Sequence, residues 1–194
     1  MFSNNIHPKF RSALLAASGT VLALAYAGPV LADVDLAKST VSAVSHQMNV
    51  PVDGKFKKFS AAVDFDPSKP AAGHAQLSID TSSYDLGDED YNQQVRDKEW
   101  FDATAFPTAT FVSTSIAAAA GGVYSVSGKL TIKGKTLDVV APVTFKQDGA
   151  NQVFDGVLPI KRLQFGIGTG EWKDTSVVAD DVQIKFHIVN AGKK

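Results

Sequence analysis

Residues 124–145 read YSVSGKLTIKGKTLDVVAPVTF, and this stretch decides the fold class. Apolar residues fall at nearly every second position on both sides of Lys133-Gly134-Lys135, which is typical of two antiparallel strands joined by a tight turn. Pro142 faces away from the apolar side of the second strand. Because proline cannot donate a hydrogen bond to a neighbouring strand, Pro142 predicts an edge or a bulge at that point.

The same alternation recurs along most of the chain. It is clear in residues 59–66 (FSAAVDFD) and 182–189 (VQIKFHIV). The predicted strands are 40–48, 59–66, 75–79, 108–116, 124–132, 137–145, 153–163 and 182–188. Eight strands at these intervals, with turn residues between them, are typical of an all-β barrel or sandwich.

One segment departs from the strand pattern. Residues 88–103 (DEDYNQQVRDKEWFDA) begin with three acids and continue with good helix formers. Tyr91, Val95 and the pair Trp100-Phe101 follow at helical spacing. Since acids are favourable at the start of a helix, the segment predicts a single amphipathic helix.

Composition excludes several classes of function. The chain has 194 residues, 19 Lys plus Arg, 20 Asp plus Glu and no Cys. The balanced charge gives no basic surface for nucleic acid, and without Cys there is no disulfide, thiolate or iron–sulfur chemistry. No nucleophile elbow occurs, and we expect no enzyme and no required cofactor.

The N-terminus is typical of an exported protein. His7, Lys9 and Arg11 precede an apolar run over residues 13–27 that is short for a membrane span. It predicts a signal peptide over residues 1–32, cut after Ala32, with a cut after Ala27 and an uncleaved anchor helix as alternatives. The expected location of the product is the bacterial periplasm.

The histidines do not form a recognisable metal motif. His46, His74 and His187 lie on different predicted strands, without a partner His two or four positions away. A metal site would therefore need assembly from distant strands, and none is predicted.

The pattern leaves open what fills the interior. Nearly every predicted inward face carries Phe, Leu, Ile or Val, while Ala61, Ala75 and Ala141 are small. At eight strands a closed barrel holds either a packed core or one small-molecule cavity. Periodicity reports burial and does not distinguish the two.

Several motifs resemble those of a known family. Residues 95–103 (VRDKEWFDA) with 106–111 (FPTATF) are similar to the R-D-x-x-L-x-x-x-x-F-x-x-x-x-[FY]-P-x-x-x-F region of the YceI-like family of secreted polyisoprenoid-binding proteins. Gly54-Lys55-Phe56 and Phe65-Asp66-Pro67 resemble its G-x-F and F-D-P motifs, and residues 128–134 (GKLTIKG) resemble its G-x-L-T-I-x-G hairpin. The likeness covers residues 33–194.

This resemblance implies an eight-stranded antiparallel lipocalin-like barrel with one amphipathic helix, built by one lipid-binding domain over residues 33–194. The barrel would hold a long isoprenoid chain, such as a polyprenyl lipid or a quinone, in an apolar lumen. Our first hypothesis is therefore a periplasmic carrier for an amphiphilic isoprenoid.

The expected ligand contacts are bulky residues on the predicted inward faces, together with Trp100 and Phe101, which would cover one end of the lumen. They are Phe56, Phe59, Phe65, Leu77, Ile79, Trp100, Phe101, Phe111, Leu137, Val139, Phe145, Ile184 and Phe186. Arg96 or Lys98 would meet a phosphate or quinone oxygen there. The alternative for Arg96 is an ion pair with Asp97 or Asp102.

A second hypothesis comes from the Gly-rich loop between Phe165 and Trp172, which resembles a branch of the family found beside membrane b-type cytochromes. The chain would then be a redox accessory that uses a bound quinone or a metal or haem site containing His46. The partners considered are the isoprenoid lipid, an inner-membrane b-type cytochrome in transient contact, and a second copy in a homodimer. A third alternative is a filled barrel that acts through its surface.

Overall fold

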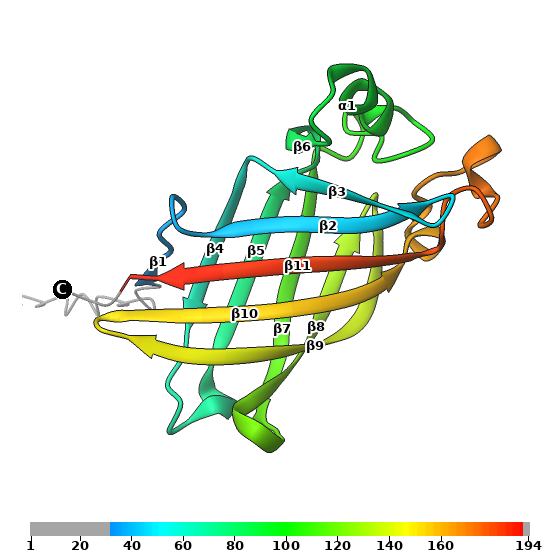
Figure 1. Cartoon of the computed structure of the whole chain (residues 1–194). Helices are drawn as coiled ribbons and strands as arrows, with labels where there is room; N and C mark the ends of the chain where they lie inside the picture. The colour runs from blue at the N-terminus through cyan, green and yellow to red at the C-terminus, as the bar shows by residue number, and fades with distance from the viewer. Residues whose placement is uncertain (1–31, 192–194) are drawn as a thin grey trace, which may run out of the picture. The chain divides into compact units, whose positions relative to one another are not determined.

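The computed structural model describes residues 32–191, and these residues form one long sheet with a single α-helix (Figure 1). The strands are β1 Ala32–Asp33, β2 Thr40–Gln47, β3 Val50–Phe56, β4 Phe59–Asp64, β5 His74–Asp80, β6 Tyr84–Asp85, β7 Thr108–Ala118, β8 Val123–Ile132, β9 Lys135–Asp148, β10 Asn151–Lys161 and β11 Asp181–Asn190. The helix is α1 Glu89–Arg96, and the short 3-10 turns are η1 Pro70–Ala72, η2 Thr81–Ser83, η3 Ala120–Gly122, η4 Arg162–Phe165 and η5 Gly170–Lys173.

The sheet is antiparallel throughout and strongly curled. Its strand order is β1-β4-β5-β7-β8-β9-β10-β11-β2-β3-β6. Within residues 32–191 no ladder joins the end strands β1 and β6, so the sheet is a half-barrel. The expected all-β class with one helix is confirmed, whereas the closed eight-stranded barrel is wrong.

The sequence pattern missed the two-residue strands β1 and β6 and one longer strand, β3, which reads VPVDGKF. Pro51, Asp53 and Gly54 are poor strand formers, and most of its side chains are exposed, so no apolar alternation marks it. It pairs with β2 through a two-residue turn in which Met48 and Asn49 have φ of 49° and 64°. Hairpin turns of this kind need positive φ at both central residues, and Met is an uncommon choice there.

The ladder between β9 and β10 is incomplete. It joins residues 143–148 to 151–156, and beyond Val143 and Gly156 the two strands are no longer paired. Pro142 and Pro159 lie in the parts of β9 and β10 that do not pair with each other; Pro142 is opposite Ser125 of β8, and Pro159 is opposite Gln183 of β11. The pattern predicted an edge or bulge at Pro142, and the structure places that residue at the position where pairing with β10 ends.

The helix is shorter than the 88–103 segment predicted. Asp88 caps its start, since its carboxylate accepts hydrogen bonds from the backbone N–H groups of Asp90 at 2.9 Å and Tyr91 at 3.2 Å. The helix ends at Arg96, and the N–H of Phe101 then donates to the carbonyl of Val95 at 3.0 Å. This turn, and not a continued helix, brings the next aromatic side chains to the inner face of the sheet, because they pack against the buried core.

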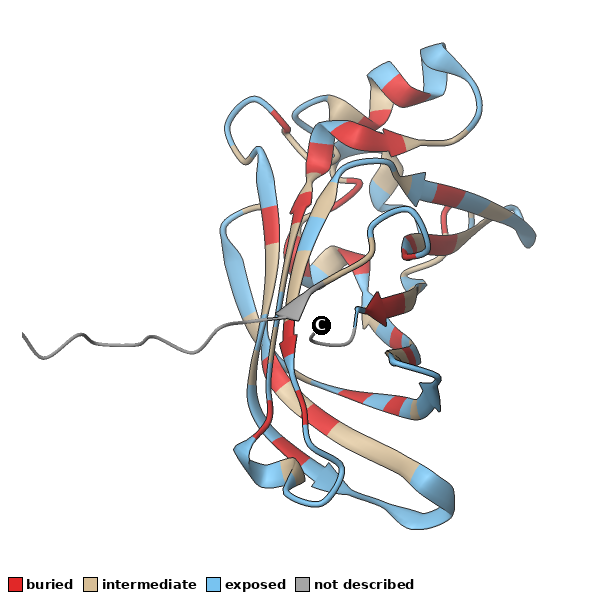
Figure 2. Ribbon diagram, turned by 90° about the vertical axis from the view of Figure 1, so that its left-hand side faces the viewer, coloured by how far each residue is buried: buried red, intermediate tan, exposed pale blue. Residues whose placement is uncertain are grey.

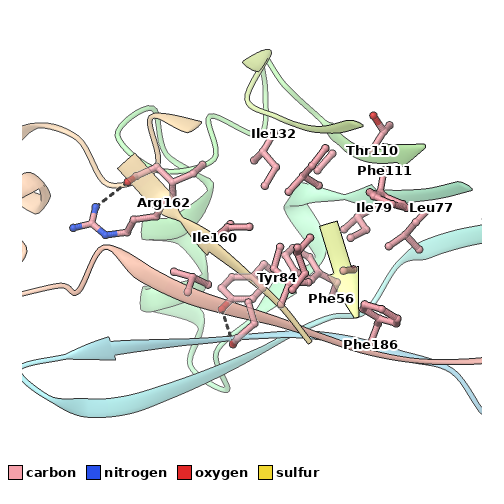
Figure 3. A pocket seen from close by; sticks show the side chains of 18 of the residues that line it. Phe56, Leu77, Ile79, Tyr84, Thr110, Phe111, Ile132, Ile160, Arg162 and Phe186 are labelled. Atoms are coloured by element: carbon pink, nitrogen blue, oxygen red, sulfur yellow. Dashed lines mark hydrogen bonds between the residues drawn. The ribbon is translucent and has the colours of Figure 1, made fainter. Parts of the chain in front are cut away.

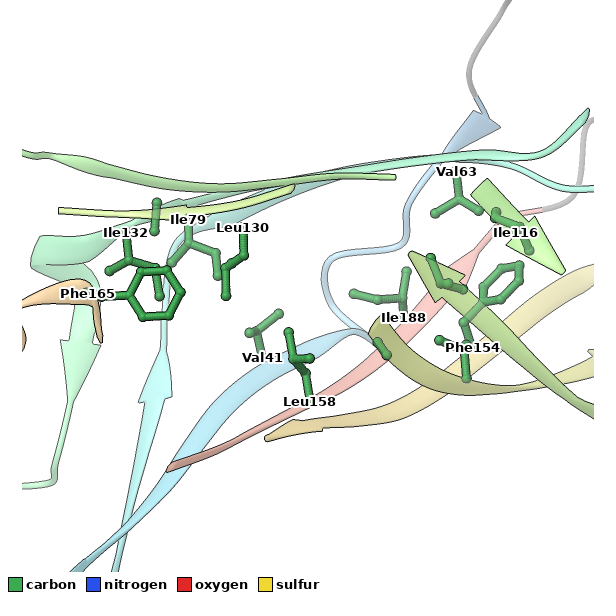
Figure 4. Packing of buried hydrophobic residues seen from close by; sticks show 14 of the residues in the cluster. Val41, Val63, Ile79, Ile116, Leu130, Ile132, Phe154, Leu158, Phe165 and Ile188 are labelled. Atoms are coloured by element: carbon green, nitrogen blue, oxygen red, sulfur yellow. The ribbon is translucent and has the colours of Figure 1, made fainter. Parts of the chain in front are cut away.

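The core lies on the concave face of the sheet. Along the strands buried and exposed residues alternate (Figure 2). The inward residues form one large cluster in which Phe165, at 1% exposure, packs near Ile132 and Ile79 at one end, while Phe154 and Val63 lie at the other (Figure 4). The interior cavity lies between these two ends of the cluster.

The leader predicted over residues 1–32 lies, but for its last residue, outside the described part of the chain. Between residues 32 and 191 the structure has no helix with the length and apolar character of a membrane span.

Candidate functional site

A cavity of about 470 Å³ runs inside the curled sheet. Each of the nine strands of six or more residues contributes to its lining, and so do α1 and the segment between β10 and β11. Most of the lining side chains are apolar (Figure 3). Small-molecule sites are usually concave, apolar and of this size, so the cavity is the candidate functional site.

The interior is hollow although many inward residues are aromatic. Three of these aromatic side chains lean across a neighbouring strand and end over a glycine: Tyr84 over Gly54, Phe111 over Gly128 and Phe186 over Gly156. A side chain at any of these glycines would overlap the ring. The absence of a Cβ lets the rings lie along the wall.

At one end the cavity is lined by packed aromatic rings. The ring centroid of Phe65 lies 4.9 Å from Tyr124, 5.2 Å from Phe145 and 5.5 Å from Phe154. Contacts at these distances and tilts are favourable edge-to-face and offset arrangements. Phe65, Tyr124 and Phe154 form the cavity wall at this end, and Phe145 packs against them without lining the cavity.

One of the residues that line the cavity is a buried cation, Arg162, which directly follows β10. Arg162 is 2% exposed, and its five N–H donors all bind backbone carbonyls, namely those of Ile167, Gly168, Trp172, Val178 and Ala179, at 2.7 to 3.0 Å. No carboxylate of the described residues forms an ion pair with it.

Burial lowers the pKa of Arg162, an effect that nearby Asp180 partly opposes. A guanidinium nevertheless stays protonated at neutral pH. The residue gathers the carbonyls of the loop after β10 around one charge, and so shapes the cavity wall that this loop provides. The sequence carried no signal for it, because an arginine next to Lys161 at a strand end is expected in solvent.

Two tryptophans lie beside this cation. The ring centroids of Trp100 and Trp172 are 5.6 Å apart, and both residues line the cavity. The indole Nε1–H of Trp100 is buried and has no acceptor among the described residues. We therefore expect tryptophan fluorescence to respond to a ligand in the cavity.

Tyr84 is a second buried polar group of the lining. Its hydroxyl donates to the carbonyl of Ala43 at 3.4 Å. Burial, with a smaller contribution from Asp53, raises the pKa of Tyr84 well above its ordinary value. The hydroxyl is therefore neutral and contributes no charge to the site.

Nine of the thirteen expected ligand contacts line the cavity. They are Phe56, Phe65, Leu77, Ile79, Trp100, Phe101, Phe111, Ile184 and Phe186. The other four, Phe59, Leu137, Val139 and Phe145, are half-buried and pack against the core without reaching the cavity. That a ligand contacts any of these residues stays a prediction.

The two expected headgroup residues do not line the cavity. Arg96 forms an ion pair with Glu89 at 2.9 Å, not with Asp97 or Asp102, and its Nε donates to the carbonyl of Ser82 at 2.9 Å. Lys98 is exposed, and its carbonyl accepts a hydrogen bond from Lys133. The carboxylate partner of Arg96 lies seven residues earlier, two turns towards the start of α1, whereas the expected partners Asp97 and Asp102 follow Arg96 in the chain.

The histidines lie apart from one another. His46 is on β2, and His74 is the first residue of β5, opposite Asp64 of β4. His187 is on β11, and its ring Nδ1 lies 2.6 Å from the carboxylate of Asp155. Among residues 32–191 there is no group of three His, Cys, Asp or Glu side chains that would hold a metal ion.

The chain matches known proteins over most of its length. The model of the YceI-like domain matches residues 33–190. A UPF0312 protein of Vibrio cholerae is 30% identical over 149 residues, which are 72% of this chain and 79% of the relative. The crystal structure of Burkholderia cenocepacia BcnA is 67% identical with a TM-score of 0.81, and the match covers 82% of this chain and 100% of BcnA.

A polyisoprenoid binding domain from Saccharophagus degradans has the same fold at 22% identity, with a TM-score of 0.66 over 84% of this chain and 99% of that domain. The match of the YceI-like model extends over nearly all the described residues, and it confirms the resemblance seen in the sequence motifs. The chain belongs to the YceI-like domain family.

Proposed function

We propose that this protein binds a long amphiphilic isoprenoid, a polyprenyl lipid or a quinone, and carries it through the periplasm. The observation that carries the proposal is the apolar cavity of about 470 Å³, lined from all nine longer strands. Each CH2 buried there contributes roughly 0.8 kcal/mol, so a hydrocarbon tail supplies most of the binding energy. The protein acts by binding and needs no covalent chemistry or cofactor.

Two findings support the choice of ligand. The chain is a member of the YceI-like family, and a protein of the same fold from Saccharophagus degradans is described as a polyisoprenoid binding domain. The cavity lining offers few polar groups, which suits a ligand that is mostly hydrocarbon.

The test is native mass spectrometry of protein purified gently from the expressing cell, followed by organic extraction. The expected result is a co-purifying apolar lipid that organic solvent removes. A visible absorption band or a bound metal would instead support the redox accessory of a b-type cytochrome. An empty protein that takes up no isoprenoid when supplied with one would contradict the carrier and favour action through the surface.

The location belongs to the same proposal. N-terminal sequencing of the exported protein should show a chain that begins at Asp33, after cleavage behind Ala32. A chain that keeps its leader and stays with the membrane would contradict a free periplasmic carrier.

A further inference from the structure

The three pairs of ring and glycine share one geometry. Gly156 is directly opposite Phe186 in the β10–β11 ladder, so both positions face the cavity side of the sheet. The three ring atoms Cζ, Cε1 and Cε2 of Phe186 are the atoms closest to where a Cβ of residue 156 would be. The ring thus leans across β10 and uses the space that any other residue there would fill.

The other two pairs are diagonal neighbours on the same face. Phe111 is opposite Leu130, two residues from Gly128, and Tyr84 is opposite Phe56, two residues from Gly54. Diagonal partners at this spacing lie within reach of an aromatic side chain. The pairs come from three separate parts of the sheet, so rings are held against the wall on several sides of the cavity.

The cavity that results is elongated. Its lining on β11 extends from Val182 to Ile188, which is six strand steps or roughly 20 Å. Phe186 belongs to this stretch of the lining, so the position of its ring sets how wide the cavity is beside β11.

We propose that Gly54, Gly128 and Gly156 are specificity-determining positions, because they seat Tyr84, Phe111 and Phe186 along the wall. The selected ligand class is the single slender chain, and fused-ring lipids are excluded. This inference rests on the proposed lipid-binding function and adds the feature that selects among lipids.

Gly156→Ala is a direct test, because the three atoms nearest to the added Cβ all belong to the Phe186 ring, whereas a Cβ at residue 128 would also lie 2.6 Å from the carbonyl oxygen of Val112. The added methyl group should push the ring into the cavity. Binding of geranylgeraniol, followed by tryptophan fluorescence, should weaken about tenfold, which corresponds to roughly two buried methylene groups. The double variant Gly156→Ala/Phe186→Leu should recover binding to within about threefold, because a shorter side chain no longer competes for the same space.

A second variant tests the width without crowding the strand. Phe186→Ala should bind geranylgeraniol less tightly but cholesterol more tightly, so that the preference for the single chain falls about tenfold or more. Val157→Ala, on the exposed face next to Gly156, is the matched control and should change neither affinity.

The outcomes separate the two proposals. Wild-type protein that binds neither lipid overturns the carrier function, and a crystal structure of Gly156→Ala then still tests the inference through the position of the Phe186 ring. Wild-type binding that Gly156→Ala leaves unchanged, a ring that stays in place, or a preference for cholesterol in the wild type would overturn the role of the glycines.

Discussion

The guanidinium carbon of Arg162 lies 6.0 Å from the ring centroid of Trp100, at the wall formed by the loop after β10. Arg162 has no carboxylate partner among the described residues, so the five backbone carbonyls and this ring together stabilise its charge. The conformation of the loop after β10 and the packing of Trp100 therefore both depend on Arg162.

Replacing that residue should be costly. Arg162→Met leaves five backbone carbonyls, three of them in buried hydrogen bonds, without their donor, and hydrogen bonds to a charged group are among the strongest. We expect the free energy of unfolding to fall by about 3–5 kcal/mol, measured by urea denaturation. Arg96→Met removes a partly exposed ion pair and one hydrogen bond, and as the matched control it should cost about 1 kcal/mol. Equal costs for the two variants would contradict the organising role of Arg162.

Trp100 should tolerate phenylalanine better than alanine. The indole N–H is buried without an acceptor, which costs about 1–3 kcal/mol in the folded state. Trp100→Phe removes that cost together with some apolar area, so stability should change by less than about 1 kcal/mol, whereas Trp100→Ala should lose about 3–5 kcal/mol. Thermal denaturation of both variants checks this. A large loss in Trp100→Phe would show that the N–H is bonded in solution.

Filling the cavity should abolish lipid uptake. Ala141 is buried, lines the cavity and is opposite Val126. Ala141→Trp should place a large side chain in the lumen, and uptake of geranylgeraniol should fall at least tenfold while far-ultraviolet circular dichroism stays unchanged. The neighbouring Val140 is 56% exposed, and Val140→Trp should bind as the wild type does. Unchanged uptake by Ala141→Trp would contradict the cavity as the lipid site.

Acid should loosen the attachment of α1. Asp85 accepts hydrogen bonds from Lys57 at 2.7 Å and from buried Asn92 of α1 at 2.8 Å. These two bonds, of which that from Lys57 has the larger effect, and a third from the N–H of Gly87 lower the pKa of Asp85 to about 2. Because the pKa is lower in the folded state, this contribution to stability is present above pH 4 and is lost as the pH falls from about 4 to 2.

Asp85→Asn should therefore make the stability of the protein less dependent on pH between about 4 and 2, as measured by urea denaturation at several pH values. Lys57→Met removes the largest cause of the shift and should reduce the same dependence. A pH profile identical to that of the wild type in both variants would contradict this role of Asp85.

For the strands that it predicted, the sequence by itself determined which residues face inward. Side chains alternate along an extended backbone by local geometry, so Ile184 and Phe186 were predicted inward and line the cavity, while Val140 is exposed. It also identified the family, since the motifs around Gly54, Arg96 and Gly128 stand in order along the chain.

Only the tertiary structure decided which inward residues meet at the cavity. A cavity is the volume that side chains from distant strands leave empty, and no local pattern reports it. Val139 faces inward as predicted but packs against its neighbours, whereas Arg162, which sequence statistics place in solvent, is buried because loop carbonyls surround it. In the sequence, Gly156 is only a residue that weakens a strand. The structure gives the physical reason for a glycine there, since the Phe186 ring occupies the space that a side chain at this position would need.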